Sequence, residues 1–180
     1  PRRELGIRSI FNLLGPLTNP ANVPNMVLGV YDKKWLRPLA EVMKKLGGKN
    51  ILVVHSEDGL DEISISANTL VTELKNNKIT EYSVSPEDFG MRKGILNDLR
   101  VKDPEESLEL IKSALTKQAV LSTKVEAASD MIAMNAGAAL YVSGIAKDLK
   151  EGVILAQDSI GSGLAKEKIS ELASFTNCFN

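Results

Sequence analysis

Residues 26–54 read MVLGVYDKKWLRPLAEVMKKLGGKNILVV, and this stretch decides the fold. Its two ends, Met26–Val30 and Ile51–Val54, are apolar and rich in β-branched residues, which is typical of buried strands. Between them, apolar side chains recur at helical spacing and stop at Gly47-Gly48, with Pro38 in the expected first turn. A strand, a helix and a strand in this order predict two parallel strands joined by a right-handed crossover.

The sequence after this unit continues with strands and then with helices. Residues 70–74 and 79–84 are typical of two strands joined by a polar turn, which predicts a hairpin. Asp103-Pro104 predicts a helix start, because Asp is a preferred N-cap and Pro suits the first turn. From Glu126 onward the pattern is almost wholly helical.

The remaining segments complete the prediction of the fold. One helix is expected to end near Gly144, and two more are expected around residues 149–160 and 164–175. Residues 2–14 have the apolar spacing of a short helix that ends at Gly15-Pro16. We therefore predict an α/β fold that is part of a mostly parallel sheet flanked by helices, with a helical C-terminal third.

The composition excludes several classes of protein. The 180 residues contain 22 Lys plus Arg and 23 Asp plus Glu, giving a net charge of −1, and only 4% are aromatic. This balance disfavours a general nucleic-acid binder, whose affinity comes from neutralised phosphates and stacked bases. One cysteine (Cys178, interpreted as an incidental thiol) and one histidine exclude an internal disulfide and a multi-histidine metal centre. Without a membrane span or a signal peptide, we expect a cytoplasmic protein of one domain.

An acidic segment follows the second predicted strand. His55–Glu62, HSEDGLDE, holds four carboxylates within six residues, and ligand sites in open α/β sheets lie outside the carboxyl ends of strands. Adjacent acids repel one another, and Mg²⁺ relieves this repulsion while sharing oxygens with a phosphorylated substrate. Asp61-Glu62 is therefore a candidate metal site, and a solvated acidic turn is the alternative that the spacing leaves open.

The cationic start of the chain is a second candidate site. Arg2 and Arg3 carry guanidinium forks, which match carboxylates. Gly15-Pro16, followed by Asn19-Pro20, predicts a non-helical path that lets the backbone approach a flat ligand. Surface salt bridges and a simple connection are the alternatives. His55 is interpreted as a hydrogen-bonded structural imidazole, with a general base as the alternative.

Several of these motifs together resemble the anthranilate phosphoribosyltransferase family. Residues 2–20, RRELGIRSIFNLLGPLTNP, are similar to a long signature of that family, and Asp58–Glu62 follows at the family's spacing. Met134–Ala136 and Ala173–Asn177 resemble its last helices. Ser56 departs from the pattern, since the family often has Gly after the histidine. The resemblance extends over essentially the whole chain.

The resemblance covers only the later part of such an enzyme. It implies that residues 1–180 form the C-terminal part of the α/β catalytic domain, with a nucleoside phosphorylase/phosphoribosyltransferase-like fold. The family's helical N-terminal domain and its diphosphate-binding Gly-rich loop have no counterpart in these residues. Because the chain also opens at Pro1 without an initiator Met, we expect a fragment that is inactive alone.

The resemblance also implies a reaction and a set of residue roles. The reaction transfers a 5-phosphoribosyl group from phosphoribosyl diphosphate to anthranilate and releases pyrophosphate, in tryptophan biosynthesis. Arg2 is implied to hold the carboxylate of anthranilate, Gly15 and Pro16 to line its channel, and Asp61 and Glu62 to coordinate Mg²⁺ bound to the diphosphate. No covalent nucleophile is required. The complete protein is expected to be a homodimer without nucleic-acid or membrane partners.

Two relatives of the same fold are the alternatives. A pyrimidine nucleoside phosphorylase also works at an anomeric carbon, but the signature at Arg2 favours anthranilate. A non-catalytic relative that binds nucleic acid predicts a strongly basic surface and the loss of Asp61-Glu62. The chain has a net charge of −1 and retains both acids, so the phosphoribosyltransferase is the function we predict.

Overall fold

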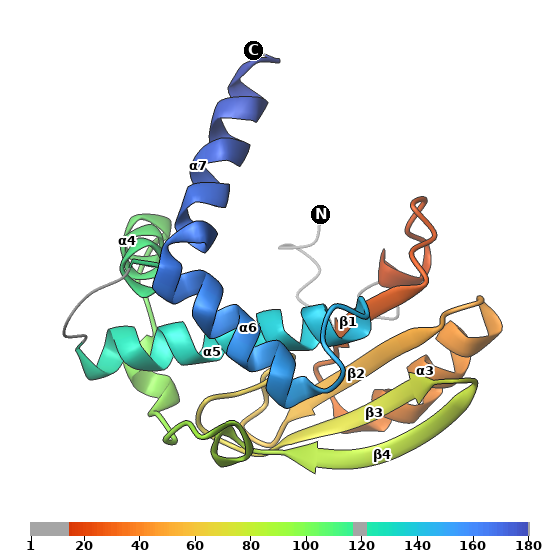
Figure 1. Cartoon of the computed structure of the whole chain (residues 1–180). Helices are drawn as coiled ribbons and strands as arrows, with labels where there is room; N and C mark the ends of the chain where they lie inside the picture. Colours follow the sequence, from red (N-terminus) through yellow and green to blue (C-terminus); the bar gives the residue numbers. More distant parts are fainter. Residues whose placement is uncertain (1–14, 117–121, 180) are drawn as a thin grey trace, which may run out of the picture.

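Figure 1 shows the computed structural model, which describes residues 15–116 and 122–179. A twisted sheet forms one layer, α3 covers one of its faces, and α5 and α6 lie over the other. In chain order the elements are β1 (Asn25–Gly29), η1 (Lys33–Trp35), α3 (Leu36–Lys45), β2 (Asn50–Ser56), β3 (Thr69–Lys75), β4 (Lys78–Val84), η2 (Pro86–Phe89), η3 (Leu96–Leu99), α4 (Pro104–Ala114), α5 (Thr123–Val142), α6 (Leu149–Ser162) and α7 (Leu164–Asn177).

The four strands form a mixed sheet in the order β1-β2-β3-β4. β1 and β2 are parallel, from Asn25 opposite Asn50 to Gly29 opposite Val54, whereas β2–β3 and β3–β4 are antiparallel. The predicted α/β class is confirmed. The expected parallel character is confined, among the described residues, to the first pair, because β2 and β3 are joined by a loop and not by a crossover helix.

The predicted hairpin is confirmed as β3 and β4. Lys75 pairs with Lys78 across the turn, and the two residues between them, Asn76 and Asn77, have φ values of 50° and 62°. Asparagine tolerates this left-handed region, which two-residue hairpin turns require.

β2 is buried on both of its faces, as its apolar sequence predicts. Ile51 and Val53 belong to a core between the sheet and α3. Leu52 and Val54 belong to a larger core between the sheet, α5 and α6. Successive side chains of a strand point to opposite faces, so this one apolar strand contributes to the cores on both sides of the sheet.

Polar contacts fasten α5 across the sheet. Asn50 Nδ2, at the start of β2, donates to the carbonyl oxygen of Val142 at 3.3 Å. Lys75 Nζ donates to Tyr141 Oη at 2.9 Å, and Tyr141 Oη donates to Glu73 Oε1 at 2.5 Å. These bonds join the C-terminal end of α5 to β2 and β3 and so fix the direction in which the rest of the helix runs.

The helical part agrees with the sequence-based predictions. Asp103 caps α4 by accepting from the backbone N–H of Glu106 at 2.8 Å. Gly163, at φ +89°, separates α6 from α7, and α7 projects away from the body (Figure 1). None of the described helices combines the length and apolar character needed to cross a membrane. The helix predicted over residues 2–14 lies outside the described residues, but residues 15–17 are helical, so the prediction that Gly15-Pro16 ends a helix and begins a non-helical path is wrong.

Candidate functional site

The acidic loop, residues 57–68, joins the carboxyl end of β2 to β3. Its ends are closed by backbone bonds, from Glu57 N to Asn68 O and from Ser56 N to Leu60 O, both at 2.9 Å. Gly59 has φ +91°, a conformation that a side chain would strain. The loop is therefore a tightly turned segment with a defined shape.

Asp58 stabilises this loop from within. Its carboxylate accepts hydrogen bonds from Ser64 Oγ at 2.5 Å and from Ser66 Oγ, and also from the backbone N–H of Leu60 at 3.3 Å. Partial burial alone would raise the pKa of Asp58, but the bonds from these hydroxyl groups outweigh it and hold the pKa below its ordinary value. Asp58 is thus a structural acid of the loop.

Asp61 and Glu62 have different surroundings. Within the part of the chain that the structure describes, neither carboxylate accepts a hydrogen bond or forms an ion pair. Neighbouring protein atoms exclude water from part of Glu62 and raise its pKa, and the adjacent Asp61 raises it further. Two adjacent carboxylates that repel each other, and that have no partner among the described residues, leave their oxygens available to a cation.

Two contacts that the sequence did not reveal hold these acids in place. A Cβ on Gly29, the last residue of β1, would lie 1.6 Å from the carbonyl oxygen of Asp61, so the loop backbone rests directly on β1. On the other side, the amide of Asn135 in α5 pairs with the backbone of Ile63. An asparagine in the middle of an apolar helix is the signal in the sequence that points to such a bond.

Glu62 also borders an apolar groove between α4 and α5. The groove has a volume of about 430 Å³, and its lining residues are Glu62, Leu99, Val101, Ser107, Leu110, Ile111, Ala128, Met131, Ile132, Asn135 and Ala136.

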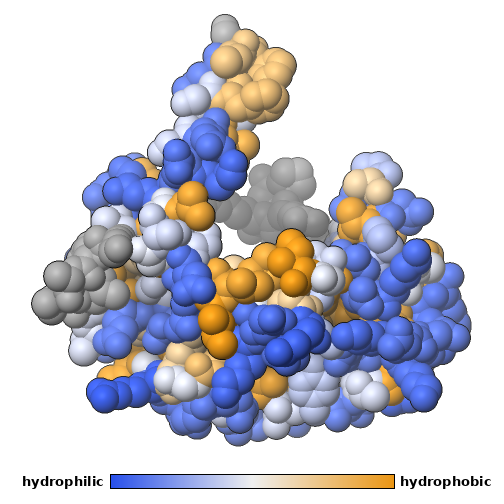
Figure 2. Space-filling model, in the orientation of Figure 1, coloured by the Kyte–Doolittle hydropathy of each residue, from blue (hydrophilic) through white to orange (hydrophobic). Residues whose placement is uncertain are grey.

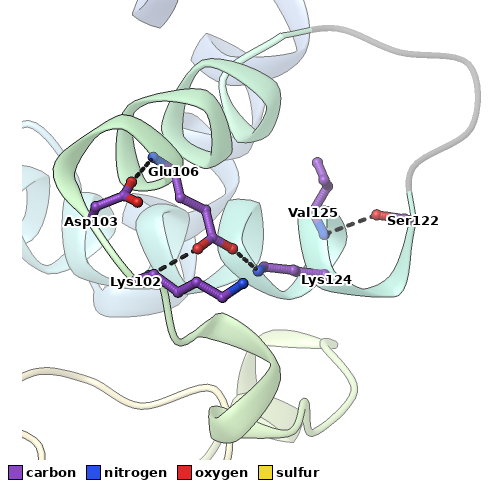
Figure 3. A network of polar contacts seen from close by, with 6 residues as sticks. All are labelled: Lys102, Asp103, Glu106, Ser122, Lys124 and Val125. Atoms are coloured by element: carbon purple, nitrogen blue, oxygen red, sulfur yellow. Dashed lines mark hydrogen bonds and ion pairs between the residues drawn. The ribbon is translucent and has the colours of Figure 1, made fainter.

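Polar bonds beside this groove join its two walls (Figure 3). Glu106 of α4 accepts from Lys124 Nζ of α5 at 3.3 Å and from the backbone N–H of Lys102 at 2.9 Å. Both bonds lower the pKa of Glu106, and the bond from the backbone of Lys102 has the larger effect. The N-terminal turns of α4 and α5 are therefore fastened to each other.

Gly15 and Pro16 lie at the other end of β1. Pro16 lines a cavity of about 220 Å³ together with Pro24 and Met26, where β1 begins. Asp61 lies against Gly29, where β1 ends. The described structure therefore does not bring Gly15 and Pro16 together with the acidic loop.

Arg2 lies outside the described residues, so its expected proximity to the acids stays a prediction. His55 is half-buried, and its Nδ1 is 2.8 Å from the carbonyl oxygen of Val30. The interpretation of His55 as a hydrogen-bonded structural residue agrees with this contact.

The donor set at the acidic loop fits a magnesium ion. Mg²⁺ takes one or two protein carboxylates and completes its shell with water and substrate oxygens, which is what Asp61 and Glu62 offer. Among residues 15–116 and 122–179, no group of three or more His, Cys, Asp and Glu side chains forms a closed metal cage. Asp61 and Glu62 are therefore a candidate site for a metal whose other ligands are water and substrate oxygens.

Comparison with known proteins places the chain in a family. A family model described as "Glycosyl transferase family, a/b domain" matches residues 1–166. The anthranilate phosphoribosyltransferase of Marinomonas sp. (strain MWYL1) is 58% identical over 179 residues, which are 99% of this chain and 51% of that protein. The enzyme of the same name from Pseudomonas fluorescens (strain Pf0-1) is 54% identical over 179 residues. The chain spans about half the length of the curated relatives it matches.

Solved structures give the same result. Anthranilate phosphoribosyltransferase from Thermus thermophilus has a TM-score of 0.83 and 38% identity, over 97% of this chain and 50% of that one. The Saccharomyces cerevisiae enzyme in complex with 4-fluoroanthranilate has a TM-score of 0.80 and 30% identity, over 94% and 48%. The same yeast enzyme in complex with PRPP and Mg has a TM-score of 0.79 and 29% identity, over 94% and 47%.

Proposed function

This chain belongs to the glycosyl transferase family, a/b domain, and on that premise we propose that it is the C-terminal part of the α/β catalytic domain of an anthranilate phosphoribosyltransferase. The proposed reaction transfers 5-phosphoribosyl from phosphoribosyl diphosphate to anthranilate and gives N-(5-phosphoribosyl)anthranilate and pyrophosphate, as a step of tryptophan biosynthesis. The observation that carries the proposal is the 58% identity, over 179 residues, to a protein of that name.

The rest of the polypeptide has to supply what this chain lacks. Since the chain matches 51% of that relative, we propose that a helical N-terminal domain and the diphosphate-binding Gly-rich loop precede these residues in the complete protein. On the family resemblance alone, we further propose that the complete protein is a cytoplasmic homodimer.

The acidic loop is the part of the proposed site that this chain contributes most directly. Asp61 and Glu62 would hold Mg²⁺, as their free carboxylates and the pinned loop backbone support. A bound Mg²⁺ neutralises the charge of the leaving diphosphate. The loop residues would keep the two carboxylates in place at the carboxyl ends of β1 and β2, where ligands of α/β sheets bind.

The other half of the proposed site has to orient the acceptor. In the proposed reaction the amine nitrogen bonds to the anomeric carbon as the bond to the diphosphate oxygen breaks. A weakly nucleophilic aryl amine needs positioning more than a strong base. Arg2 would bind the carboxylate of anthranilate, and Gly15 and Pro16 would line its channel, assignments that rest on the motif of residues 2–20.

The metal assignment is tested by replacing both acids in the complete polypeptide. Asp61→Asn together with Glu62→Gln is expected to lower kcat/KM by about 100-fold or more, because the leaving diphosphate loses its neutralising ion. Steady-state rates are measured as a function of Mg²⁺ concentration. Glu57→Gln, an exposed acid of the same loop, is the matched control and is expected to leave the profile unchanged. An unaltered Mg²⁺ requirement in the double variant would refute the assignment.

The substrate assignment is tested separately. Arg2→Ala is expected to raise the KM for anthranilate about 10-fold or more, because hydrogen bonds to charged groups contribute roughly 1.5–3 kcal/mol. Arg3→Ala is the control, and its anthranilate KM is expected to stay near that of the unaltered enzyme. An unchanged KM in Arg2→Ala would count against the proposed role of this guanidinium.

A further inference from the structure

We propose that Asn135 is a positioning residue that fixes Asp61 and Glu62 where a divalent cation binds them. The inference rests on the proposed function, because it assumes that the two acids hold a metal. Asn135 lies in α5, 73 and 74 residues beyond the acids that it would position.

The side-chain amide of Asn135 uses both of its polar atoms on this task. Its Oδ1 accepts from the backbone N–H of Ile63 at 3.0 Å, and its Nδ2 donates to the carbonyl oxygen of Ile63 at 2.9 Å. Nδ2 also donates to the carbonyl oxygen of Met131 at 2.9 Å, within α5. Two bonds to one residue fix both its location and its orientation, and Ile63 directly follows Glu62.

The loop is held from the other side as well. Gly29 of β1 leaves no room between its backbone and the carbonyl oxygen of Asp61. Ile63 is only 1% exposed, and the next residue, Ser64, donates its backbone N–H to Thr69 Oγ1 at 3.1 Å. The acids are thus set between β1 and α5 on a backbone that has little freedom to shift.

This arrangement matters more for binding a metal than for folding. Carboxylates coordinate Mg²⁺ within a narrow range of distance and angle, so a backbone shift that a folded loop tolerates still disrupts the ligand set. Loss of a partner that orients metal ligands typically lowers metal affinity by about 10–100-fold. Asn135 is therefore expected to influence metal affinity out of proportion to its effect on stability.

The test measures metal binding directly, without relying on turnover. Mn²⁺ alone is titrated into the complete polypeptide, and the electron paramagnetic resonance signal of free Mn²⁺ reports binding. Asn135→Ala, which suits a helix, is expected to weaken binding about 10-fold or more. Asn135→Gln, which keeps the amide but displaces it by one methylene, is the second variant and is expected to weaken binding in the same direction.

Asn50→Ala is the matched control. Asn50 is also half-buried, and its side chain also bonds the backbone of another element, at 3.3 Å from Val142 O of α5, but it lies at the end of β2 away from the acidic loop. Its loss is expected to lower the thermal unfolding midpoint, as is also expected for the loss of Asn135, while Mn²⁺ affinity stays within about 2-fold, since no metal ligand is displaced.

The possible results distinguish a failure of the positioning role of Asn135 from a failure of the proposed metal site. Unchanged Mn²⁺ affinity in both Asn135 variants would overturn the positioning role and leave the metal site intact. An equal loss of affinity in Asn50→Ala would also overturn it, because the effect would then follow from general destabilisation. If the unaltered polypeptide, with Mn²⁺ alone and with Mn²⁺ plus phosphoribosyl diphosphate, shows no Mn²⁺ binding that Asp61→Asn with Glu62→Gln abolishes, the metal site is refuted and the inference falls with it.

Discussion

Neighbouring carboxylates in the acidic loop have opposite surroundings, and this separates their functions. Asp58 accepts hydrogen bonds from Ser64 and Ser66, and its pKa is lowered. Glu62, four residues further on, has no such donors in the part of the chain that the structure describes, and burial raises its pKa. The first acid builds the loop and the second is available to a ligand. A short acidic sequence thus contains both a structural group and a candidate functional group.

Asp130 gives a prediction for the pH dependence of stability. This half-buried acid in α5 loses solvent contact and lies near Glu126, which together raise its pKa from 3.8 to about 6. A carboxyl with a raised pKa binds its proton more tightly in the folded state. This tighter proton binding stabilises the folded state fully below about pH 3.8, and its contribution to the free energy of unfolding is lost as the pH rises through about 6. Asp130→Asn is expected to be more stable than the unaltered chain at pH 7, by about 1–2 kcal/mol, because solvent screens the charge of a half-buried carboxylate and reduces the full effect of the pKa shift.

Urea denaturation at several pH values checks this prediction. The stability difference between Asp130→Asn and the unaltered chain is expected to grow between pH 4 and pH 7. Asp158→Asn, which replaces an exposed acid of α6, is the control. A difference that is the same at both pH values would show that the Asp130 carboxyl is not destabilised by its surroundings.

The residues that hold the candidate site were harder to predict than the candidate metal ligands. Asp61 and Glu62 stand out because acids cluster after a predicted strand. The contact of Gly29 with Asp61, and that of Asn135 with Ile63, join segments 32 and 72 residues apart. Local patterns carry no information on which distant backbone groups will meet, so these two residues became apparent only in the structure.

At the scale of elements, the crossing of α5 and α6 is unusually close. A Cβ on Gly137 would lie 2.5 Å from the backbone nitrogen of Val153, and one on Gly152 would lie 2.2 Å from the carbonyl oxygen of Gly137. Gly137→Ala is therefore expected to push the helices apart and to lower the free energy of unfolding by about 1–3 kcal/mol or more. Urea denaturation monitored by circular dichroism measures the change.

Gly161→Ala is the matched control for this prediction. Gly161 also lies in α6, but a Cβ there meets nothing within 4 Å, and alanine is favoured over glycine in a helix by about 1 kcal/mol. The control is expected to be neutral or stabilising. If both alanines had the same effect, the close approach of the two helices would not be a determinant of stability.

Most elements could be predicted from the sequence because local signals define them. The hairpin predicted over residues 70–74 and 79–84 is observed as Thr69–Lys75 and Lys78–Val84. The helix predicted over residues 149–160 is observed as Leu149–Ser162, beginning at the cap Asp148 and ending at Gly163. The alternation of apolar and polar residues, turn residues and helix caps act within a few residues of where they occur. The boundaries of these elements can therefore be predicted from the sequence.

At the scale of the whole molecule, the predicted site residues lie at opposite ends of β1. Asp61 lies against the end of this strand, whereas Pro16 lines a cavity at its start. Which strand pairs with which follows from connections and packing over long distances, so the antiparallel pairing of β2 with β3 was not predicted. The class of fold was predictable, because it needs only the types and order of the elements.

The C-terminal helix gives the last prediction, because it contributes little to the core of the molecule. None of the residues of α7 is buried, and the helix projects from the body with apolar side chains at its far end (Figures 1 and 2). Leu172, Phe175 and Phe179 are 61%, 63% and 75% exposed. Since stabilisation follows the apolar area removed from water, removing residues 164–180 is expected to change the free energy of unfolding by less than about 1 kcal/mol.

Denaturation of the chain with and without residues 164–180 measures this, with Val153→Ala in α6 as the comparison. Val153 is 1% exposed, so its truncation is expected to cost about 1–3 kcal/mol through lost packing. Removing the exposed apolar residues of α7 is also expected to reduce self-association in sedimentation experiments, because such patches promote contacts between molecules. If the shortened chain lost cooperative unfolding, the prediction would be wrong, and α7 would be required for the stability of the core.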